Sequence, residues 1–321
     1  MLASPTLTPP SDEAYRHEAL LYAGQDEFLA GTLAFIRTGL AAQEPILVVV
    51  SQEKIDALRE ALGDDAANVH FAEMGAVGRN PARIIPAWRR FIDEHGGQGQ
   101  RVWGIGEPIF PSRSAHEMVE CHRHESLLNL AFADTPGFWL LCPYDTEALD
   151  PEVIEEAQRN HPFVMETSGA QSDSAAYTGL EAVAAPFAEL LPDPPAPPDE
   201  MLFDADTLDM VRAFVRWHAA DAGIVDGRLA DLVVAVNEVA TNSVRHAGGQ
   251  GTLRLWEDGD ALVCEVTDDG HIDRPLVGRE LPVPDQVGGY GLWMANQLCE
   301  LVQLRSFRDG NTVRLHFDRR G

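Results

Sequence analysis

The segment 231–247, DLVVAVNEVATNSVRHA, carries a carboxylate and a carboxamide one helical turn apart. Its apolar residues recur at steps of three and four and predict a helix, with Glu238 and Asn242 on the roughly opposite side and His246 a turn further along. This pair could hold a water molecule and a hard cation together, and a lone Asn suits Mg²⁺, which keeps waters and substrate phosphates as its other ligands. The alternative is the solvated side of an amphipathic helix, and the helix alone favours that interpretation.

Three further motifs follow along the chain. The sequence TDDG (267–270) ends an apolar strand, where the carboxylate of Asp268 could accept a hydrogen bond from the exocyclic amine of adenine. The sequence GGYGL (288–292) opens a predicted helix, and its glycines let the backbone approach a phosphate at the positive helix terminus. Asn311 and Thr312 begin the last strand, where a hydroxyl could support the base-binding carboxylate. Each motif is weak by itself, because such turns are common.

Taken in order, the series E-x-x-x-N, D-x-G, G-x-G-L and a closing G-x-T strand resembles the GHKL superfamily of ATP-binding folds. Within it, EVATN (238–242) followed by HA, and GYGLW (289–293), are most similar to bacterial anti-sigma-factor serine kinases. The resemblance covers about residues 200–318. It implies an α+β domain of the Bergerat/GHKL sandwich type, with ATP and Mg²⁺ as cofactors.

The resemblance also implies a role for each motif residue. Glu238 would be the general base and Asn242 the Mg²⁺ ligand, and the segment 271–287 would be a mobile lid. The nucleotide-binding residues would be Asn242, Asp268 at the adenine, Gly270 beside the base, Gly289 and Gly291 along the phosphates, Leu292 and Thr312. Many relatives continue D-x-G with a second glycine, where this chain has His271 and Ile272. This departure puts the lid geometry and turnover in question and leaves the adenine site in place.

The first half of the chain alternates short apolar runs with helical patterns. Runs such as ILVVV (46–50) and FWLLC (138–142) are apolar throughout, which indicates strands buried on both faces. A β-α-β-α series of this kind predicts an α/β domain with a mostly parallel sheet. The expected strands are 17–23, 45–51, 68–74, 101–107 and 138–144, and the expected helices lie near 25–42, 52–62, 80–95 and 114–133.

Residues 17–165 resemble the MEDS sensory domain through HEALLYAGQDEFLAGTLAFIRTGLAAQEPILVVVS (17–51), WGIGEPIF (103–110) and RHESLLNLAF (123–132). The resemblance implies a RecA-like fold that has lost nucleotide chemistry and that senses a small organic compound. The segment 23–32, in the place of a P-loop, has no lysine and carries two acids, so triphosphate binding there is not expected.

Trp103, Glu107 and Glu125 are the candidates for a sensory pocket. Trp103 and Glu107 lie toward the carboxyl end of a predicted parallel strand, where open α/β sheets place their ligands. The alternative for Trp103 is a core position. The motif CHRHE (121–125) would offer a phosphoacceptor in a histidine kinase, but a partly exposed helix face is the simpler interpretation.

Five prolines between Leu191 and Asp199 exclude a helix or a central strand and predict a stiff, extended spacer. The segment before it, 166–179, is small and polar. We therefore expect a disordered N-terminus at 1–14, a MEDS-like domain at 15–165, a Pro-rich linker at 166–200 and a GHKL domain at 201–321.

The chain of 321 residues has 24 basic and 51 acidic side chains and a formal net charge of −27. A surface this acidic repels phosphate backbones and anionic lipids, which disfavours nucleic acid and membrane partners. The cysteines at 121, 142, 264 and 299 show no metal-binding spacing and predict reduced, buried thiols. With neither a signal sequence nor a long apolar run, these features predict a cytoplasmic protein.

The resemblances together imply a ligand-responsive signalling regulator. Its C-terminal domain would hold a sigma factor and phosphorylate a Ser or Thr of an anti-anti-sigma (STAS-type) partner, with Glu238 as the base. A second hypothesis is an ATP-loaded module that sequesters a regulator without phosphotransfer. A sensor histidine kinase is a further alternative, but the chain before the spacer offers no long heptad hairpin. Relatives of the output domain commonly dimerise.

Overall fold

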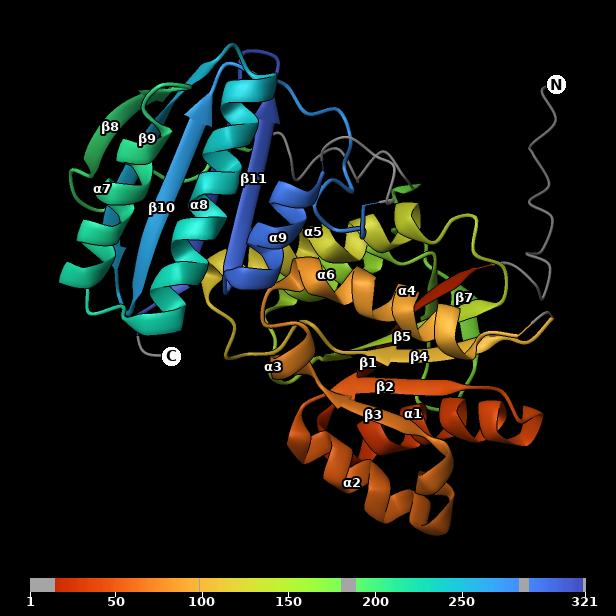
Figure 1. Cartoon of the computed structure of the whole chain (residues 1–321). Coiled ribbons are helices and arrows are strands. Elements are labelled where there is room, and N and C mark those ends of the chain that lie inside the picture. Colours follow the sequence, from red (N-terminus) through yellow and green to blue (C-terminus); the bar gives the residue numbers. More distant parts are fainter. Residues whose placement is uncertain (1–14, 98, 180–188, 283–288, 320–321) are drawn as a thin grey trace, which may run out of the picture. The chain divides into compact units, whose positions relative to one another are not determined.

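The computed structural model describes residues 15–97, 99–179, 189–282 and 289–319. The chain divides into two compact units, which are described separately (Figure 1). The first takes in the residues up to 74, 88–112 and 128–179. The second takes in 75–87, 113–127 and the chain from 180 onward.

The first unit is built on a seven-stranded sheet in the order β3-β2-β4-β5-β1-β6-β7. Neighbouring strands pair in parallel, except that β6 and β7 pair antiparallel. The strands are β1 (Arg16–Tyr22), β2 (Ile46–Val50), β3 (His70–Glu73), β4 (Val102–Gly106), β5 (Phe138–Asp145), β6 (Phe163–Met165) and β7 (Gln171–Asp173). The helices of the first 179 residues are α1 (Gly24–Ala42), α2 (Gln52–Leu62), η1 (Gly63–Asn68), α3 (Met74–Val77), η2 (Pro81–Arg83), α4 (Ile84–His95), α5 (Ala115–Ala131) and α6 (Pro151–Asn160).

Burial of the central strands on both faces confirms the predicted α/β class with a mostly parallel sheet. Every residue of β2 and β4 is buried. On β4, Trp103 lies against Gly39 of α1, and Gly104 and Gly106 on the alternate positions lie against Trp88 of α4. Helices therefore cover both faces, as continuous apolar strands require. The five expected strands are all present, while β6 and β7 were not expected from the sequence.

Strand β7 falls inside the segment 166–200 that the sequence assigned to a linker. Its pairing with β6, which itself pairs with β1, extends the sheet past residue 165. Of the expected linker, residues 180–188 lie outside the described residues, as does the expected disordered N-terminus at 1–14.

The second unit contains a five-stranded antiparallel sheet in the order β11-β12-β10-β9-β8. The strands are β8 (Asp199–Asp204), β9 (Gln250–Asp258), β10 (Ala261–Asp268), β11 (Leu301–Phe307) and β12 (Gly310–Asp318), and the helices are α7 (Leu208–Asp221), α8 (Asp226–His246) and α9 (Tyr290–Leu298). The apolar faces of the helices and alternate residues of the strands form one core. This arrangement confirms the predicted α+β class of the second domain.

Helix α5 differs from the expected partly exposed helix. Cys121, Arg123, His124 and Glu125 are each at most 1% exposed, so buried positions surround the helix at CHRHE. The expectation was wrong because it took the polar residues of the motif as a sign of a solvent-exposed face. Each of these polar side chains instead has protein neighbours.

Among the residues that the structure describes, no helix combines the length and the apolar character that crossing a membrane demands.

Candidate functional site

Asp268, the last residue of β10, is the anchor of the site in the second unit. Ser243 Oγ on α8 donates a hydrogen bond of 2.6 Å to Asp268 Oδ2. Asn311 Nδ2 and the Gly270 backbone N–H donate bonds of 2.8 and 2.9 Å to Asp268 Oδ1. Three donors from three segments therefore hold the carboxylate in one orientation as an acceptor.

The sheet pleat explains this arrangement. Asn311 on β12 lies directly opposite Asp268 on β10. Successive side chains of a strand point to opposite faces, and Val313, Leu315 and Phe317 of β12 lie in the core under the helices. Asn311 shares their face, so it reaches the carboxylate from the helix side.

The same alternation corrects the expectation for Thr312. Its side chain points to the other face of the sheet, where it lines a hollow of about 720 Å³ together with Thr252 and Thr267. The support expected from its hydroxyl comes from Asn311 and Ser243 instead. Ser243 was not expected at the site, because it occupies a buried position on the otherwise apolar face of α8.

A cavity of about 240 Å³ opens beside Asp268. Of the residues expected to bind nucleotide, Asn242, Asp268, Gly289 and Leu292 line it. Ser243 and Asn311 complete its polar wall, and residues 271–274 and Val277 close another side. Residues from two helices, two strands and a loop therefore converge on one concave site, as in ligand pockets generally.

Glu238 and Asn242 lie beside the start of α9, at the residue Gly291. A methyl group on Gly291 would lie 2.6 Å from Asn242 Nδ2 and 3.2 Å from Glu238 Oε2, so only glycine fits without displacing them. Both side chains are half-buried. The line of polar residues on α8 is therefore not a fully solvated face, because α9 packs against α8 there.

Two more glycines are required by the site. Gly289 precedes α9 with φ 97°, in the left-handed region that favours glycine, and the free backbone N–H groups of the first turn follow it. Such a helix terminus attracts anions. A methyl group on Gly270 would lie 2.6 Å from Ala247 Cβ and 2.8 Å from Asn311 Nδ2, so a side chain there would disturb the support of Asp268.

The loop that follows Gly270 is held at its start. His271 Nδ1–H donates to the Phe307 carbonyl oxygen at 2.9 Å, and the Ile272 backbone N–H donates to Ser306 Oγ at 2.8 Å. Further along, Asn296 Nδ2 on α9 donates to the Gly278 carbonyl oxygen at 2.9 Å. Residues 283–287 of the expected lid lie outside the described residues.

Arg279 of this loop takes part in a buried charge cluster around Glu120 of α5, within the second unit. Glu120 lies 2.8 Å from Arg305 Nη1, 3.1 Å from Arg279 Nη2 and 3.4 Å from Arg123 Nη1. All four side chains are at most 5% exposed. Burial lowers the pKa of Arg123 to about 9 and lowers that of Arg279, while the Glu120 carboxylate opposes both shifts.

The three candidates for a sensory pocket are buried and have different contacts. Trp103 is buried and its Nε1–H donates to Glu44 Oε2 at 2.7 Å. Glu107 accepts a hydrogen bond of 2.8 Å from the Tyr22 hydroxyl and forms an ion pair with Lys54. Glu125 belongs to a third group, on α5.

Glu107 and Lys54 nevertheless form a site at the carboxyl edge of the parallel sheet. Burial raises the pKa of the Glu107 carboxyl, and the Lys54 ammonium opposes that shift. Lys54, the single lysine of the chain, also lies 4.9 Å from the centre of the Phe28 ring. At the place of a P-loop, Glu27 accepts a hydrogen bond of 2.8 Å from the Ala23 backbone N–H at the start of α1, which leaves that terminus unsuited to a phosphate.

Comparison with known proteins identifies two regions. The family model for the MEDS domain (MEthanogen/methylotroph, DcmR Sensory domain) matches residues 16–162. The model for the histidine kinase-like ATPase domain matches residues 202–317. None of the curated proteins matches the chain.

Among solved structures, the chain is similar to the RsbU and RsbW domains of Rv1364c from Mycobacterium tuberculosis, with 23% identity and a TM-score of 0.30. The match covers 39% of this chain and 33% of that chain, so the present chain spans about a third of the length of that structure.

The corrected assignment of the last strand leads to a prediction. Asn311→Ala removes a hydrogen bond to a charged group and should weaken the ATP binding that the sequence implies by about 5- to 30-fold, equivalent to about 1–2 kcal/mol. Thr312→Val, one position along on the other face, should leave the affinity within about two-fold of wild type. Calorimetric titration of both variants, after circular dichroism has shown them folded, distinguishes the two positions. Equal losses would contradict the assignment.

Proposed function

We propose that this chain, a MEDS sensory domain joined to a histidine kinase-like ATPase domain, is a cytoplasmic, ligand-responsive regulator. Its C-terminal domain binds Mg-ATP and acts as an anti-sigma factor and serine/threonine kinase of a STAS-type anti-anti-sigma partner. In this proposal the MEDS domain is RecA-like and occupies 15–165, the linker lies within 166–200, and the ATP-binding domain occupies 201–321.

The orientation of Asp268 is the observation that carries the proposal. A carboxylate has about four lone-pair positions, and donors from Ser243, Asn311 and Gly270 occupy three of them. The remaining position can accept a hydrogen bond from a ligand in the cavity. The exocyclic amine of adenine is a donor that fits this acceptor.

The triphosphate and its metal ion have a place at the other end of the same cavity. The phosphates would lie at the amino end of α9, beside Gly289 and Gly291. Asn242 would supply a protein oxygen to Mg²⁺, whose other ligands would be phosphates and waters. Glu238 is within reach of the same point, since its carboxylate and the Asn242 amide both border Gly291.

Phosphotransfer would then need one base and one acceptor. Glu238 would take the proton of a partner Ser or Thr hydroxyl as that oxygen forms its bond to the γ-phosphorus, and the bond to the ADP oxygen would break. Positioned general bases are typically worth about 10²–10⁴ in rate.

A surface suited to a protein partner lies on α7. Met210 and Trp217, one side of this helix at i and i+7, are 60% and 65% exposed. Large apolar side chains gathered at a surface favour contact with another protein, which would be a sigma factor, a STAS-type protein or a second copy of this chain.

Two alternatives have different support. The loop after Gly270 favours sequestration of a regulator without phosphotransfer. Its hydrogen bonds to Ser306 and Phe307 oppose the movement that a lid would need. A histidine kinase is disfavoured, because His124 of the CHRHE motif is 1% exposed and His122 is half-buried.

The Glu120 cluster supports control of the ATP site by the first half of the chain. Arg279 belongs to the loop that lines the ATP cavity, and Glu120 belongs to α5, within the segment that the MEDS model matches. A small organic ligand that displaced α5 would change the contact that holds the loop.

Replacement of the base gives a test of catalysis. Glu238→Gln should lower the rate of phosphate transfer to the STAS-type proteins of the same genome by at least about 10²-fold, because the amide cannot accept the proton. Its affinity for ATP should change by less than about three-fold. Asp231→Asn, a half-buried acid two turns earlier on α8, serves as the matched control and should transfer at the wild-type rate.

Transfer labelled with γ-³²P-ATP measures this rate. Unchanged transfer by Glu238→Gln would contradict the assigned base. ATP binding without transfer to any candidate partner by the wild type would favour the sequestering alternative.

A second prediction concerns the loop. Arg279→Gln removes the charge that pairs with Glu120, so backbone amides of residues 271–282 should exchange hydrogen at least about five-fold faster than in wild type. Arg274→Gln, an exposed arginine of the same loop, is the control and should leave exchange unchanged. Hydrogen exchange read by mass spectrometry measures both. Equal exchange rates in the two variants would contradict the proposal that the contact between Glu120 and Arg279 controls the loop.

A further inference from the structure

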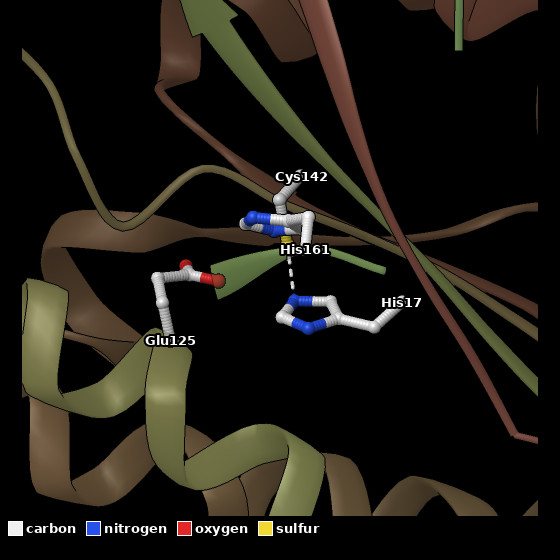
Figure 2. A group of neighbouring side chains, drawn as sticks. All are labelled: His17, Glu125, Cys142 and His161. Atoms are coloured by element: carbon white, nitrogen blue, oxygen red, sulfur yellow. Dashed lines mark hydrogen bonds between the residues drawn. The ribbon is translucent and has the colours of Figure 1, made fainter. Parts of the chain in front are cut away.

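A group of four buried side chains in the MEDS domain stands apart from the proposed nucleotide chemistry. His17, Glu125, Cys142 and His161 each offer a ligand atom, and these four atoms all lie within 4.8 Å of one another (Figure 2). All four residues are at most 1% exposed. His17 lies on β1, Glu125 on α5, Cys142 on β5 and His161 directly after α6. All four lie within the region that the MEDS model matches.

The sheet brings His17 and Cys142 together. Strands β1 and β5 are parallel neighbours, with His17 opposite Leu140 and Ala19 opposite Cys142. His17 and Cys142 therefore share one face of the sheet, two positions out of register. His17 Nε2 lies 3.4 Å from Cys142 Sγ. His161 follows α6 on the other side of β1, and its ring centre lies 4.0 Å from that of His17.

Hydrogen bonds around the group determine which ring nitrogen of each histidine carries the proton. His17 Nδ1–H donates to Asn129 Oδ1 at 3.1 Å, and Asn129 in turn donates from Nδ2 to the Asn160 carbonyl oxygen at 2.7 Å. His161 Nδ1–H donates to the Ala157 carbonyl oxygen at 2.7 Å. With Nδ1 protonated on both rings, Nε2 is the atom with the lone pair on both. Metal-binding histidines are oriented in this way.

We propose that these four residues bind one Zn²⁺ ion. Two imidazole nitrogens, a thiolate and a carboxylate are a donor set for a borderline-soft ion rather than for Mg²⁺ or Ca²⁺, which prefer oxygen. Tetrahedral Zn²⁺, with bonds of about 2.0–2.3 Å, separates its ligand atoms by roughly 3.3–3.8 Å. The 3.4 Å between Cys142 Sγ and His17 Nε2 lies in that range.

Charge favours the same ion. A thiolate and a carboxylate buried together would cost much free energy without a compensating cation, and a divalent ion neutralises the pair. The histidines then bind as neutral ligands. With four protein ligands in a dry site, the ion joins β1 to β5, α6 and α5, as closed zinc sites do.

Cobalt replaces zinc as a spectroscopic probe in the test. The full chain, purified with and without a chelator, is analysed for metal and then titrated with Co²⁺. We expect one Zn²⁺ per chain as isolated, and after removal one Co²⁺ per chain with the visible bands of a tetrahedral site and a near-ultraviolet thiolate-to-cobalt band. Metal below about 0.1 per chain and the absence of these bands, in protein that circular dichroism shows folded, would overturn the proposal.

Variants identify the ligands. Cys142→Ser should abolish the thiolate band, whereas Cys121→Ser, which removes another buried thiol of the same domain, should retain it. Glu125→Gln should weaken Co²⁺ binding by at least about ten-fold while keeping the thiolate band. If Cys142→Ser does not fold, the wild-type thiolate band together with its retention in Cys121→Ser still tests the proposal. Loss of the band in Cys121→Ser alone would contradict it.

Discussion

The pairing of Asp268 with Asn311 across β10 and β12 is the constraint on which the proposed ATP site depends. It puts a carboxylate and an amide side by side on the helix face of the sheet, and Ser243 reaches the same carboxylate from α8. The core beneath fixes α8 against the sheet, and α8 therefore fixes Glu238 and Asn242 beside Gly291 at the start of α9. One polar contact, held by an apolar core, thus positions the proposed adenine-binding end of the cavity and, through α8, the proposed Mg²⁺-binding end.

The sequence pointed to several residues that line this cavity because its motifs are local. A helical step of four residues brings Glu238 and Asn242 into one line, and a glycine before a helix predicts an anion-binding terminus. The sequence-based expectation differed from the structure where it depended on which residues of the last strand face the helices. Asn311 and Thr312 are adjacent, and only one of them can face the helices. The alternation of Val313, Leu315 and Phe317 already carried that information, since Asn311 continues their series.

Contacts between distant parts of the chain were not predictable in the same way. The four cysteines show no metal-binding spacing, yet Cys142 meets His17 because β1 and β5 are neighbours in the sheet. Strand order follows from the whole packing rather than from any short motif. Helix α5 shows the same effect, since its polar motif CHRHE is buried and the helix carries both Glu125 of the proposed zinc site and Glu120 of the arginine cluster. The proposed zinc site and the contact of Glu120 with Arg279 therefore both depend on residues of one helix.

Calorimetric titration of ATP into the full chain, with and without Mg²⁺, tests whether the cavity beside Asp268 binds the nucleotide. We expect the wild type to bind ATP, and to bind it more tightly with Mg²⁺. We expect binding weakened by at least about 30-fold in Asp268→Asn, whose amide presents a donor where adenine needs an acceptor. In Asn242→Ala, binding should persist without Mg²⁺ and lose most of the Mg²⁺-dependent gain. A folded wild-type protein that binds no ATP, or an Asp268→Asn variant that binds it as tightly as the wild type, would contradict the proposed adenine site.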